Sequence, residues 1–374
     1  MNNQRHSIAR GFTIIELLVA TAITALLMTL MVTIITGVTK SWSSSSGKLT
    51  SGGQARLILD QITKDLQGAI IRSDGNTWMA ATVLSDKTTW ASGSAKPLTN
   101  SDTTDNYSVD LAAVNGQAVA SNNKGAIAQA RFGVSGVWLR FFTTQPGTNT
   151  TGQLDTLSAP VAVSYRLMYG NVTPSASSAK RYMLYRGQVT PTATFAAGYN
   201  LDPTSTTLAY PVQSTQPADT DSGTVKTIFW PARSDVLAEN VVDFGVRMYV
   251  KETVGGTTNL RLVFPAEAVP AQNGGSAVGK PYGTTVAVSN ISATDPQTYH
   301  YSKSGTTSAT DYYANTFPDV IEVMVRVLTS DGVQKLELLE NPPAGYTPPE
   351  TWWQIVEANS TVYTRRIQIN AKAF

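Results

Sequence analysis

The side chain with the clearest chemical consequence in this sequence is the carboxylate of Glu16. It is the only charged residue in an apolar run that extends from Phe12 to Thr39. A carboxylate at the centre of a membrane-spanning helix costs about 2.5 to 3.5 kcal/mol on insertion scales, and less near a helix end. Some other interaction must therefore offset the burial of Glu16.

The remaining inventory offers little for catalysis. The chain has no cysteine, and its two histidines are His6 and His300. A Ser-His-Asp, Cys-His or multi-histidine metal site cannot be assembled from that inventory without unusual variants. Nucleophile-elbow and phosphate-loop motifs are absent as well. We expect no enzyme and no cofactor, and we interpret His300 as a packing or surface residue.

Two acidic segments have weak calcium-like spacing. Asp219 and Asp221 have the spacing of the first ligands in an oxygen-rich calcium loop. Trp230, however, occupies the position at which an EF-hand has its bidentate glutamate. Asp102 and Asp105 form a similar weak candidate. We interpret both segments as polar turns and expect no metal site.

One aromatic pair is a candidate binding platform. Trp352 and Trp353 follow two proline pairs, and exposed aromatic side chains serve as anchors for sugars or partner proteins. Buried aromatic residues are commoner, so packing is the alternative.

The apolar run is preceded by a short basic leader. Residues 1–11 carry Arg5, His6 and Arg10, and positive charge favours the cytoplasmic side of a membrane, which places residues beyond about 40 outside. A secretory signal has an apolar core of about 7 to 15 residues, which is shorter than this run. A plain anchor needs about 20 apolar residues, but it explains neither Glu16 nor the Gly11-Phe12 junction.

The leader, Gly11, Phe12, Glu16 and the apolar helix together resemble the type IV prepilin superfamily, which includes the pseudopilins of type II secretion systems. The resemblance implies that a prepilin peptidase cuts between Gly11 and Phe12 and methylates the new amino terminus of Phe12. It also implies that Glu16 meets the amine of Phe12 in a neighbouring subunit and so sets the register of polymerisation. The implied partners are the prepilin peptidase, other pilin or pseudopilin subunits and the inner-membrane assembly platform.

The sequence predicts four segments. Residues 1–11 form the cleaved leader, and residues 12–39 form a transmembrane and assembly helix. In residues 40–77 we expect a weak or broken stretch over residues 40–53, because serine and glycine are poor helix formers. An amphipathic helix follows, with Ile58, Ile62, Leu66 and Ala69 or Ile70 on its apolar stripe and Arg56, Asp60 and Lys64 on another face.

The last segment, residues 78–374, is a β-rich head. Apolar and polar residues alternate with a period of two, which predicts antiparallel strands with one buried and one wet face. No second long helical pattern is found, so the predicted fold class is α+β, with a long N-terminal helix on a mostly antiparallel sheet. The expected strands cover residues 137–142, 161–169, 182–186, 242–250, 260–264, 321–327 and 367–373.

Long polar connections separate these strands, at residues 92–128, 144–158, 190–225 and 270–315. The strand series, which includes Val163-Ser-Tyr-Arg-Leu and Phe317-Pro-Asp-Val-Ile-Glu-Val, is similar to that of large minor pilins and the J-type minor pseudopilin. A narrower resemblance is to the prepilin-like Verru_Chthon cassette protein C. The long connections depart from the compact pattern of the J-type family, so the resemblance leaves the exact subunit role open.

Charge and composition bound the function. Removing Arg5 and Arg10 with the leader leaves equal numbers of basic and acidic side chains, so we expect no nucleic-acid partner. The resemblance implies a single-pass protein of the bacterial inner membrane with its head outside the cytoplasm. As such it is a minor subunit of a type IV pilus or a type II secretion pseudopilus, at the filament tip or in initiation. The alternative is a filament-displayed adhesin that recognises a surface or polysaccharide through the long connections or Trp352 and Trp353.

Overall fold

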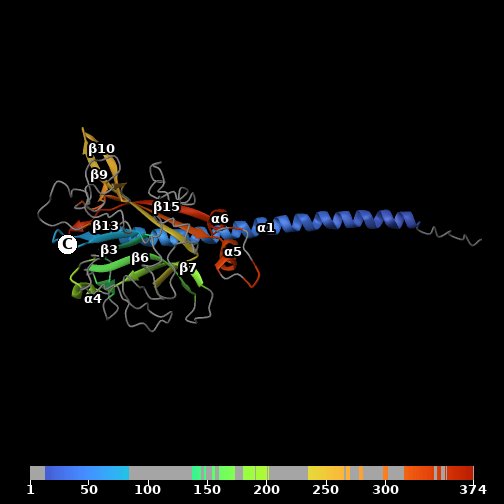
Figure 1. Ribbon diagram of the computed structural model, residues 1–374, viewed down its shortest axis with the longest axis horizontal. Coiled ribbons are helices and arrows are strands. Elements are labelled where there is room, and N and C mark those ends of the chain that lie inside the picture. The colour runs from blue at the N-terminus through green and yellow to red at the C-terminus, as the bar shows by residue number, and fades with distance from the viewer. Residues whose placement is uncertain are drawn as a thin grey trace, which may run out of the picture. The chain divides into compact units, whose positions relative to one another are not determined.

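A computed structural model of the chain (Figure 1) describes the following residues: 13–83, 137–144, 147–148, 154–155, 160–172, 180–189, 191–199, 201, 235–264, 267–269, 278–280, 298–301, 316–340, 343–346, 350 and 352–373. The chain divides into two compact units, Met1–Leu49 and Thr50–Phe374. The second unit contains the sheets and is called the head below.

Helix α1 is continuous from Ile14 to Gln67, so residues 40–53, which were expected to form a weak or broken stretch, do not break the helix. Serine and glycine lower helix stability by about 1 kcal/mol or less per residue relative to alanine, and tertiary packing overrides such a preference. Within the head, the small residues Ser51 and Gly52 face Tyr363. The Ser51 hydroxyl lies 3.4 Å from the Tyr363 hydroxyl, and a β-carbon on Gly52 would lie 3.4 Å from the same oxygen.

The helix also ends earlier than the expected apolar stripe. Ile58, Ile62 and Leu66 are fully buried in α1 as predicted. Ala69 is buried beyond the helix, and Ile70 begins the short strand β1 (Ile70–Ile71). The spacing therefore identified the buried residues correctly but placed the last turn of the helix too far along the chain.

Six strands form an antiparallel sheet in the order β13-β2-β3-β6-β7-β8. Their bounds are Met79–Val83 (β2), Val137–Thr144 (β3), Pro160–Asn171 (β6), Lys180–Gln188 (β7), Val236–Glu239 (β8) and Thr298–Tyr301 (β13).

Four strands form a second antiparallel sheet in the order β10-β9-β14-β15. Their bounds are Val241–Val254 (β9), Thr257–Phe264 (β10), Val320–Leu328 (β14) and Ser360–Gln368 (β15). The chain passes directly from β8 to β9 through Asn240, whose φ of 61° lies in the left-handed region that asparagine tolerates better than most residues.

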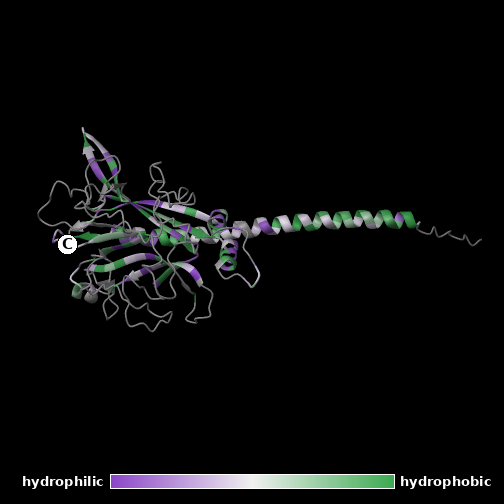
Figure 2. Cartoon of the chain, viewed as in Figure 1, coloured by the Kyte–Doolittle hydropathy of each residue, from purple (hydrophilic) through white to green (hydrophobic). Residues whose placement is uncertain are grey.

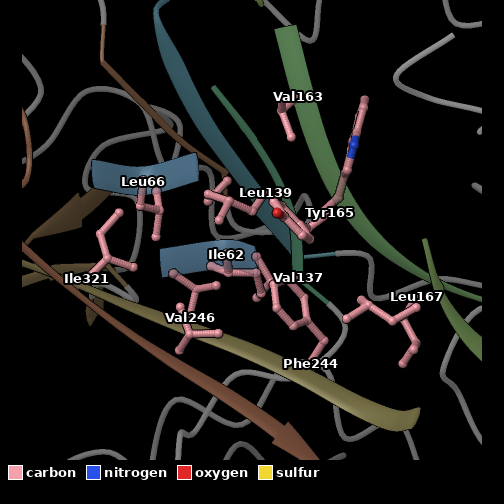
Figure 3. Close-up of a cluster of buried hydrophobic side chains, with 14 of the residues drawn as sticks. Ile62, Leu66, Val137, Leu139, Val163, Tyr165, Leu167, Phe244, Val246 and Ile321 are labelled. Atoms are coloured by element: carbon pink, nitrogen blue, oxygen red, sulfur yellow. The ribbon is translucent and has the colours of Figure 1, made fainter. Parts of the chain in front are cut away.

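The head part of α1 lies between these two sheets (Figure 1). Figure 3 shows Ile62 and Leu66 of the helix between Leu139 and Tyr165 on one side and Val246 and Ile321 on the other. One apolar stripe of α1 therefore packs against both sheets, and the helix lies at the centre of the hydrophobic core that they share.

Both faces of the central strands are buried, which corrects the expectation of one wet face. All side chains from Val161 to Leu167 in β6 are buried, and β14 has a single half-buried position, Glu322. The face of the six-stranded sheet away from α1 contains the buried arginines Arg140 and Arg166. The guanidinium of Arg140 stacks 3.8 Å from the ring centroid of Trp138 on the same face. Alternation thus marked β6 and β14 correctly, but their polar positions are covered rather than wet.

Further elements lie in stretches that were expected to be polar connections or plain sheet. Helices α5 (Ser330–Glu340) and α6 (Trp352–Asn359) and the short helix α4 were not predicted from the sequence, although none of them is a second long helix. The expected terminal strand over residues 367–373 is wrong, because β15 ends at Gln368 and β16 is separate. The short elements are β4 (Gly147–Thr148), β5 (Leu154–Asp155), α4 (Pro191–Ala196), β11 (Glu267–Val269), β12 (Val278–Lys280) and β16 (Lys372–Ala373), which pairs in parallel with β1.

Candidate functional site

The N-terminal part of α1 is an exposed apolar surface. Among the described residues, α1 is the one helix that is long and apolar enough to cross a membrane. Ile14 is 84% exposed, and large apolar side chains remain exposed along the helix as far as Leu49. Figure 2 shows this part of α1 coloured as hydrophobic along most of its length. Such a surface is stable only when lipid or other apolar surface covers it.

The threonines of this helix satisfy their own hydroxyl groups. The hydroxyls of Thr24, Thr29, Thr33 and Thr39 each donate a hydrogen bond of 2.7 to 2.9 Å to the backbone carbonyl four residues earlier. Threonine in a membrane helix meets its hydrogen-bonding need in this way. The polar residues in the run therefore do not prevent its insertion into a bilayer.

Glu16 forms a capping box with Thr13 at the start of α1. A Glu16 carboxylate oxygen accepts hydrogen bonds from the Thr13 backbone N–H (3.2 Å) and hydroxyl (3.1 Å), and the Glu16 N–H donates to the Thr13 hydroxyl oxygen (3.3 Å). These bonds satisfy two backbone donors that a helix start leaves without partners. The negative charge also lies at the positive end of the helix dipole.

The rest of the predicted processing signal lies outside the described residues. This applies to Arg5, Arg10, Gly11 and Phe12. The capping box nevertheless fixes a local boundary, because the helix begins at Ile14, just after the proposed cleavage junction.

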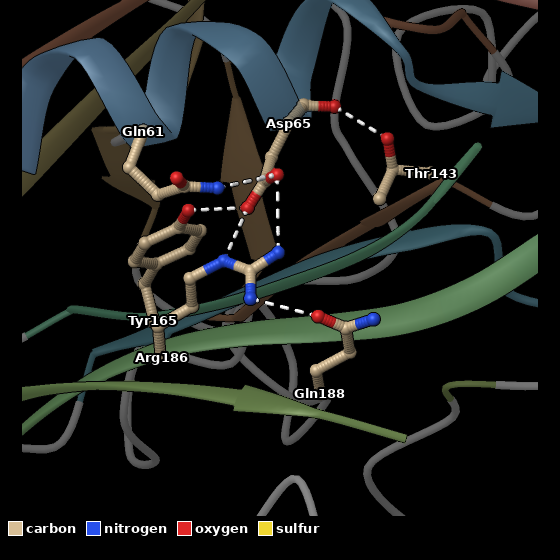
Figure 4. Close-up of polar contacts among 6 residues, drawn as sticks. All are labelled: Gln61, Asp65, Thr143, Tyr165, Arg186 and Gln188. Carbon is tan, nitrogen blue, oxygen red and sulfur yellow. Dashed lines mark hydrogen bonds and ion pairs between the residues drawn. The ribbon is translucent and has the colours of Figure 1, made fainter. Parts of the chain in front are cut away.

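A second polar site holds the head part of α1 and was not predicted from the sequence. Asp65 is fully buried, and its two carboxylate oxygens accept from Arg186 at 2.7 Å (Nε) and 3.2 Å (Nη2). Its carboxylate also accepts from the Tyr165 hydroxyl at 2.5 Å and from the Gln61 side-chain amide at 3.1 Å. We call Gln61, Asp65, Tyr165 and Arg186 the Asp65 cluster (Figure 4).

Together with Thr143, the cluster connects the helix to three neighbouring strands. Tyr165 lies on β6 and Arg186 on β7, and their backbones are paired in register. From β3, the Thr143 hydroxyl donates to the backbone carbonyl of Asp65 at 2.7 Å. One residue of α1 is thereby bound to the centre of the six-stranded sheet through both its side chain and its backbone.

The electrostatics of the cluster follow from burial. Desolvation, followed by the charge of Asp65 and the hydrogen bond to it, raises the pKa of Tyr165 well above its ordinary value of 10.0. Burial alone would lower the pKa of Arg186, but the hydrogen bond and charge of Asp65 outweigh it and raise that pKa. The cluster is therefore a neutral tyrosine beside a compensated ion pair, and its arrangement serves structure rather than proton transfer.

A signal for Asp65 was present in the sequence. The residue lies three positions after Ile62 and one before Leu66, on the apolar side of the predicted amphipathic helix. A carboxylate on that side requires a buried cation. The partner Arg186 could not be chosen from the sequence, because the strand order that brings β7 to the helix is a long-range property.

The structure describes the other predicted site residues only in part. Trp352 and Trp353 are the first two residues of α6, and their side chains lie outside the described ones. His300 lies in β13 opposite Ala80. The candidate calcium segments around Asp102 and Asp219 lie outside the described residues, and no group of three metal-ligating side chains occurs within the described part of the chain.

Comparison with protein-family models, curated proteins and solved structures gives no match for this chain.

Proposed function

We propose that this protein is a minor pilin or pseudopilin subunit of a type IV pilus or a type II secretion pseudopilus. The observation that carries the proposal is the composition of α1. A membrane-length apolar segment with a carboxylate in its first turn continues, without a break, into the helix at the core of an antiparallel head. A plain anchor joined to a separate secreted domain requires no such continuity.

The position of Glu16 supports the same proposal. Its carboxylate is exposed and lies in a local capping box, in which Thr13 is its one side-chain partner among the described residues. After cleavage at Gly11, the new amine of Phe12 lies one residue before Thr13. In an assembling filament, the Glu16 carboxylate forms an ion pair with the amine of Phe12 in a neighbouring subunit. This pair offsets the cost of burying a carboxylate in an apolar helix bundle.

The size of the head supports a minor role. The second unit, Thr50–Phe374, contains two large sheets and further short strand pairs, and it would be difficult to repeat at every position of a tight helical filament. We place the subunit at the filament tip or in the initiating complex, rooted in the bacterial inner membrane with its head outside the cytoplasm. Purified filaments in which this protein is the major component would contradict that position.

The decisive experiment is intact-mass and N-terminal analysis of the protein extracted from membranes of its own host. The expected result is a chain that begins at N-methylated Phe12. A chain that begins at Met1, or one cut near residue 40, would contradict the proposal.

A pair of glycine variants makes the experiment specific. Gly11→Val places a β-branched side chain at the proposed scissile bond, so we expect the full-length chain to accumulate. Gly37→Val is the matched control, because a β-carbon at Gly37 meets nothing within 4 Å. Its processing should equal that of the wild type.

A further inference from the structure

We infer that Asp65 is a positioning residue that sets the axial register of α1 between the two sheets of the head. This inference concerns the folded head and does not rest on the proposed function. It begins with the apolar contacts. Ile58, Ile62 and Leu66 follow one another at intervals of four residues, are similar in volume and are all fully buried.

Such a stripe specifies the register of a helix only weakly. Moving α1 by one turn, about 5.4 Å, replaces one branched aliphatic side chain by the next at two of the three positions. Burial of apolar area has no directional preference and would change little. The contacts that are lost completely in a shifted register are the directional ones.

The Asp65 cluster provides directional contacts of this kind. Three contacts require Asp65 at one position. They are the bidentate ion pair with Arg186, the hydrogen bond from the Tyr165 hydroxyl, and the hydrogen bond from Thr143 to the Asp65 backbone carbonyl. A shift of one turn would bring Gln61 or Ala69 opposite Arg186, and neither can accept as a carboxylate does. Arg186 would then be left near the core without its anion, which is strongly unfavourable.

A second ion pair between α1 and a sheet, among the residues that the structure describes, is different. Arg365 of β15 donates to Asp60 at 2.5 Å, but the Asp60 side chain is 56% exposed. Water can replace either partner there, so this pair constrains the helix little. The two pairs form a matched comparison of a buried and an exposed contact between the same helix and its sheets.

The test is a distance measurement in the full-length protein in detergent. The chain has no cysteine, so spin labels attach only to the two introduced cysteines, Gly53→Cys and Asn370→Cys. A β-carbon at Gly53 meets nothing within 4 Å. Asn370 is exposed two residues before β16, which pairs with β1 after the end of α1. An axial shift of α1 therefore changes the distance between the labels by most of one turn.

The two labels are placed in three backgrounds: wild type, Asp65→Leu with Arg186→Met, and Arg365→Gln. Replacing a buried ion pair by apolar residues often preserves or increases stability, so the double variant is expected to fold. We expect one distance in the wild type and in Arg365→Gln. In the double variant we expect a second population, displaced by about 5 Å from the first.

A single unchanged distance in the double variant would overturn the inference, because the apolar contacts and the backbone bonds from Thr143 and Thr144 would then suffice without the Asp65 carboxylate. A second population of equal size in Arg365→Gln would also overturn it, since burial of the pair would not matter. If the double variant does not fold, Asp65→Asn with Tyr165→Phe is measured and judged by the same two outcomes. Loss of thermal stability with one unchanged distance counts against register control and identifies only a structural contact.

Discussion

At Glu16, helix capping and the proposed contact between subunits depend on the same carboxylate. In the proposed scheme Thr13 takes part only in the cap, through its backbone N–H and its hydroxyl. The two functions can therefore be separated by changing one residue at a time.

We predict that Thr13→Ala and Glu16→Gln weaken the start of α1 to a similar extent, by about 1 kcal/mol, but differ in assembly. Thr13→Ala keeps the negative charge and should still enter filaments, whereas Glu16→Gln should remain in the membrane. The measurement is the fraction of each variant in sheared filaments or in cross-linked subunit complexes. Equal incorporation of both variants would contradict the role of the Glu16 charge.

The raised pKa of Tyr165 gives a prediction of stability at high pH. A tyrosine whose pKa is raised by folding keeps its proton after the unfolded chain has lost it. Its contribution is complete below pH 10 and decreases above that value by up to about 1.4 kcal/mol per pH unit. Burial also raises the pKa values of Tyr249 and Tyr301, so they add to the decrease.

Tyr165→Phe should lower stability at pH 8 by about 1 to 3 kcal/mol, since Asp65 loses a buried hydrogen bond. It should also make stability fall less steeply between pH 10 and 11. Thermal unfolding across this range measures both effects. The exposed Tyr346→Phe is the control, and a Tyr165→Phe profile as steep as the control would contradict the prediction.

Two glycines, one within α1 and one just after its end, have opposite surroundings. A β-carbon at Gly53 meets nothing within 4 Å, whereas at Gly68, just after the helix, it would lie 2.7 Å from the Thr143 hydroxyl and 2.8 Å from the Thr144 carbonyl oxygen. The Thr144 N–H donates to the Gly68 carbonyl at 2.9 Å, so the two backbones are close together. The first glycine weakens the helix, and the second permits the contact between helix and sheet.

We predict that Gly53→Ala stabilises the protein by up to about 1 kcal/mol, because alanine is the better helix former. Gly68→Ala should destabilise it by about 1 to 3 kcal/mol through overpacking against backbone. Urea unfolding of the two variants, side by side, measures the difference. If both variants stabilised the protein, or both destabilised it, the effect assigned to one of the two glycines would be wrong.

The sequence predicted the elements whose pattern is local. The buried stripe of α1 and the strands around Val163, Val246 and Val323 were identified from their periods. Helix α5 was missed because it begins Ser330-Asp-Gly332, which is typical of a turn. Gly332 is required there by packing, since a β-carbon would lie 2.7 Å from the Asn359 side chain. That contact joins α5 to α6 and cannot be predicted from either segment alone.

At the scale of the whole molecule, the head depends on residues from Thr50 onward. The core cluster draws on α1 from Ala55 and on both sheets, and the Asp65 cluster lies entirely within the same unit. Two sheets that share one helix were not predicted, because the strand order that makes them depends on pairings distant in sequence. The head therefore has its own hydrophobic core.

We predict that a fragment of residues 50–374 folds as a soluble protein, whereas the full-length chain requires detergent or lipid. The fragment lacks the exposed apolar part of α1 and keeps every contact of the Asp65 cluster. Circular dichroism and gel filtration measure folding and association, and Ile62→Ala in the same fragment is the control for core packing. That variant should lose about 2 to 5 kcal/mol of stability. An aggregated parent fragment would contradict the prediction.

The turn between β9 and β10 has a practical consequence. Beyond Tyr249, the described part of β9 pairs with β10 alone, and the two strands meet at Gly255 and Gly256, whose φ values of 60° and 83° suit a two-residue hairpin turn. The side chains around this turn are exposed, so an epitope tag inserted between the two glycines should leave the core intact. Antibody binding to intact cells would then distinguish a head displayed at the cell surface from one retained in the periplasm.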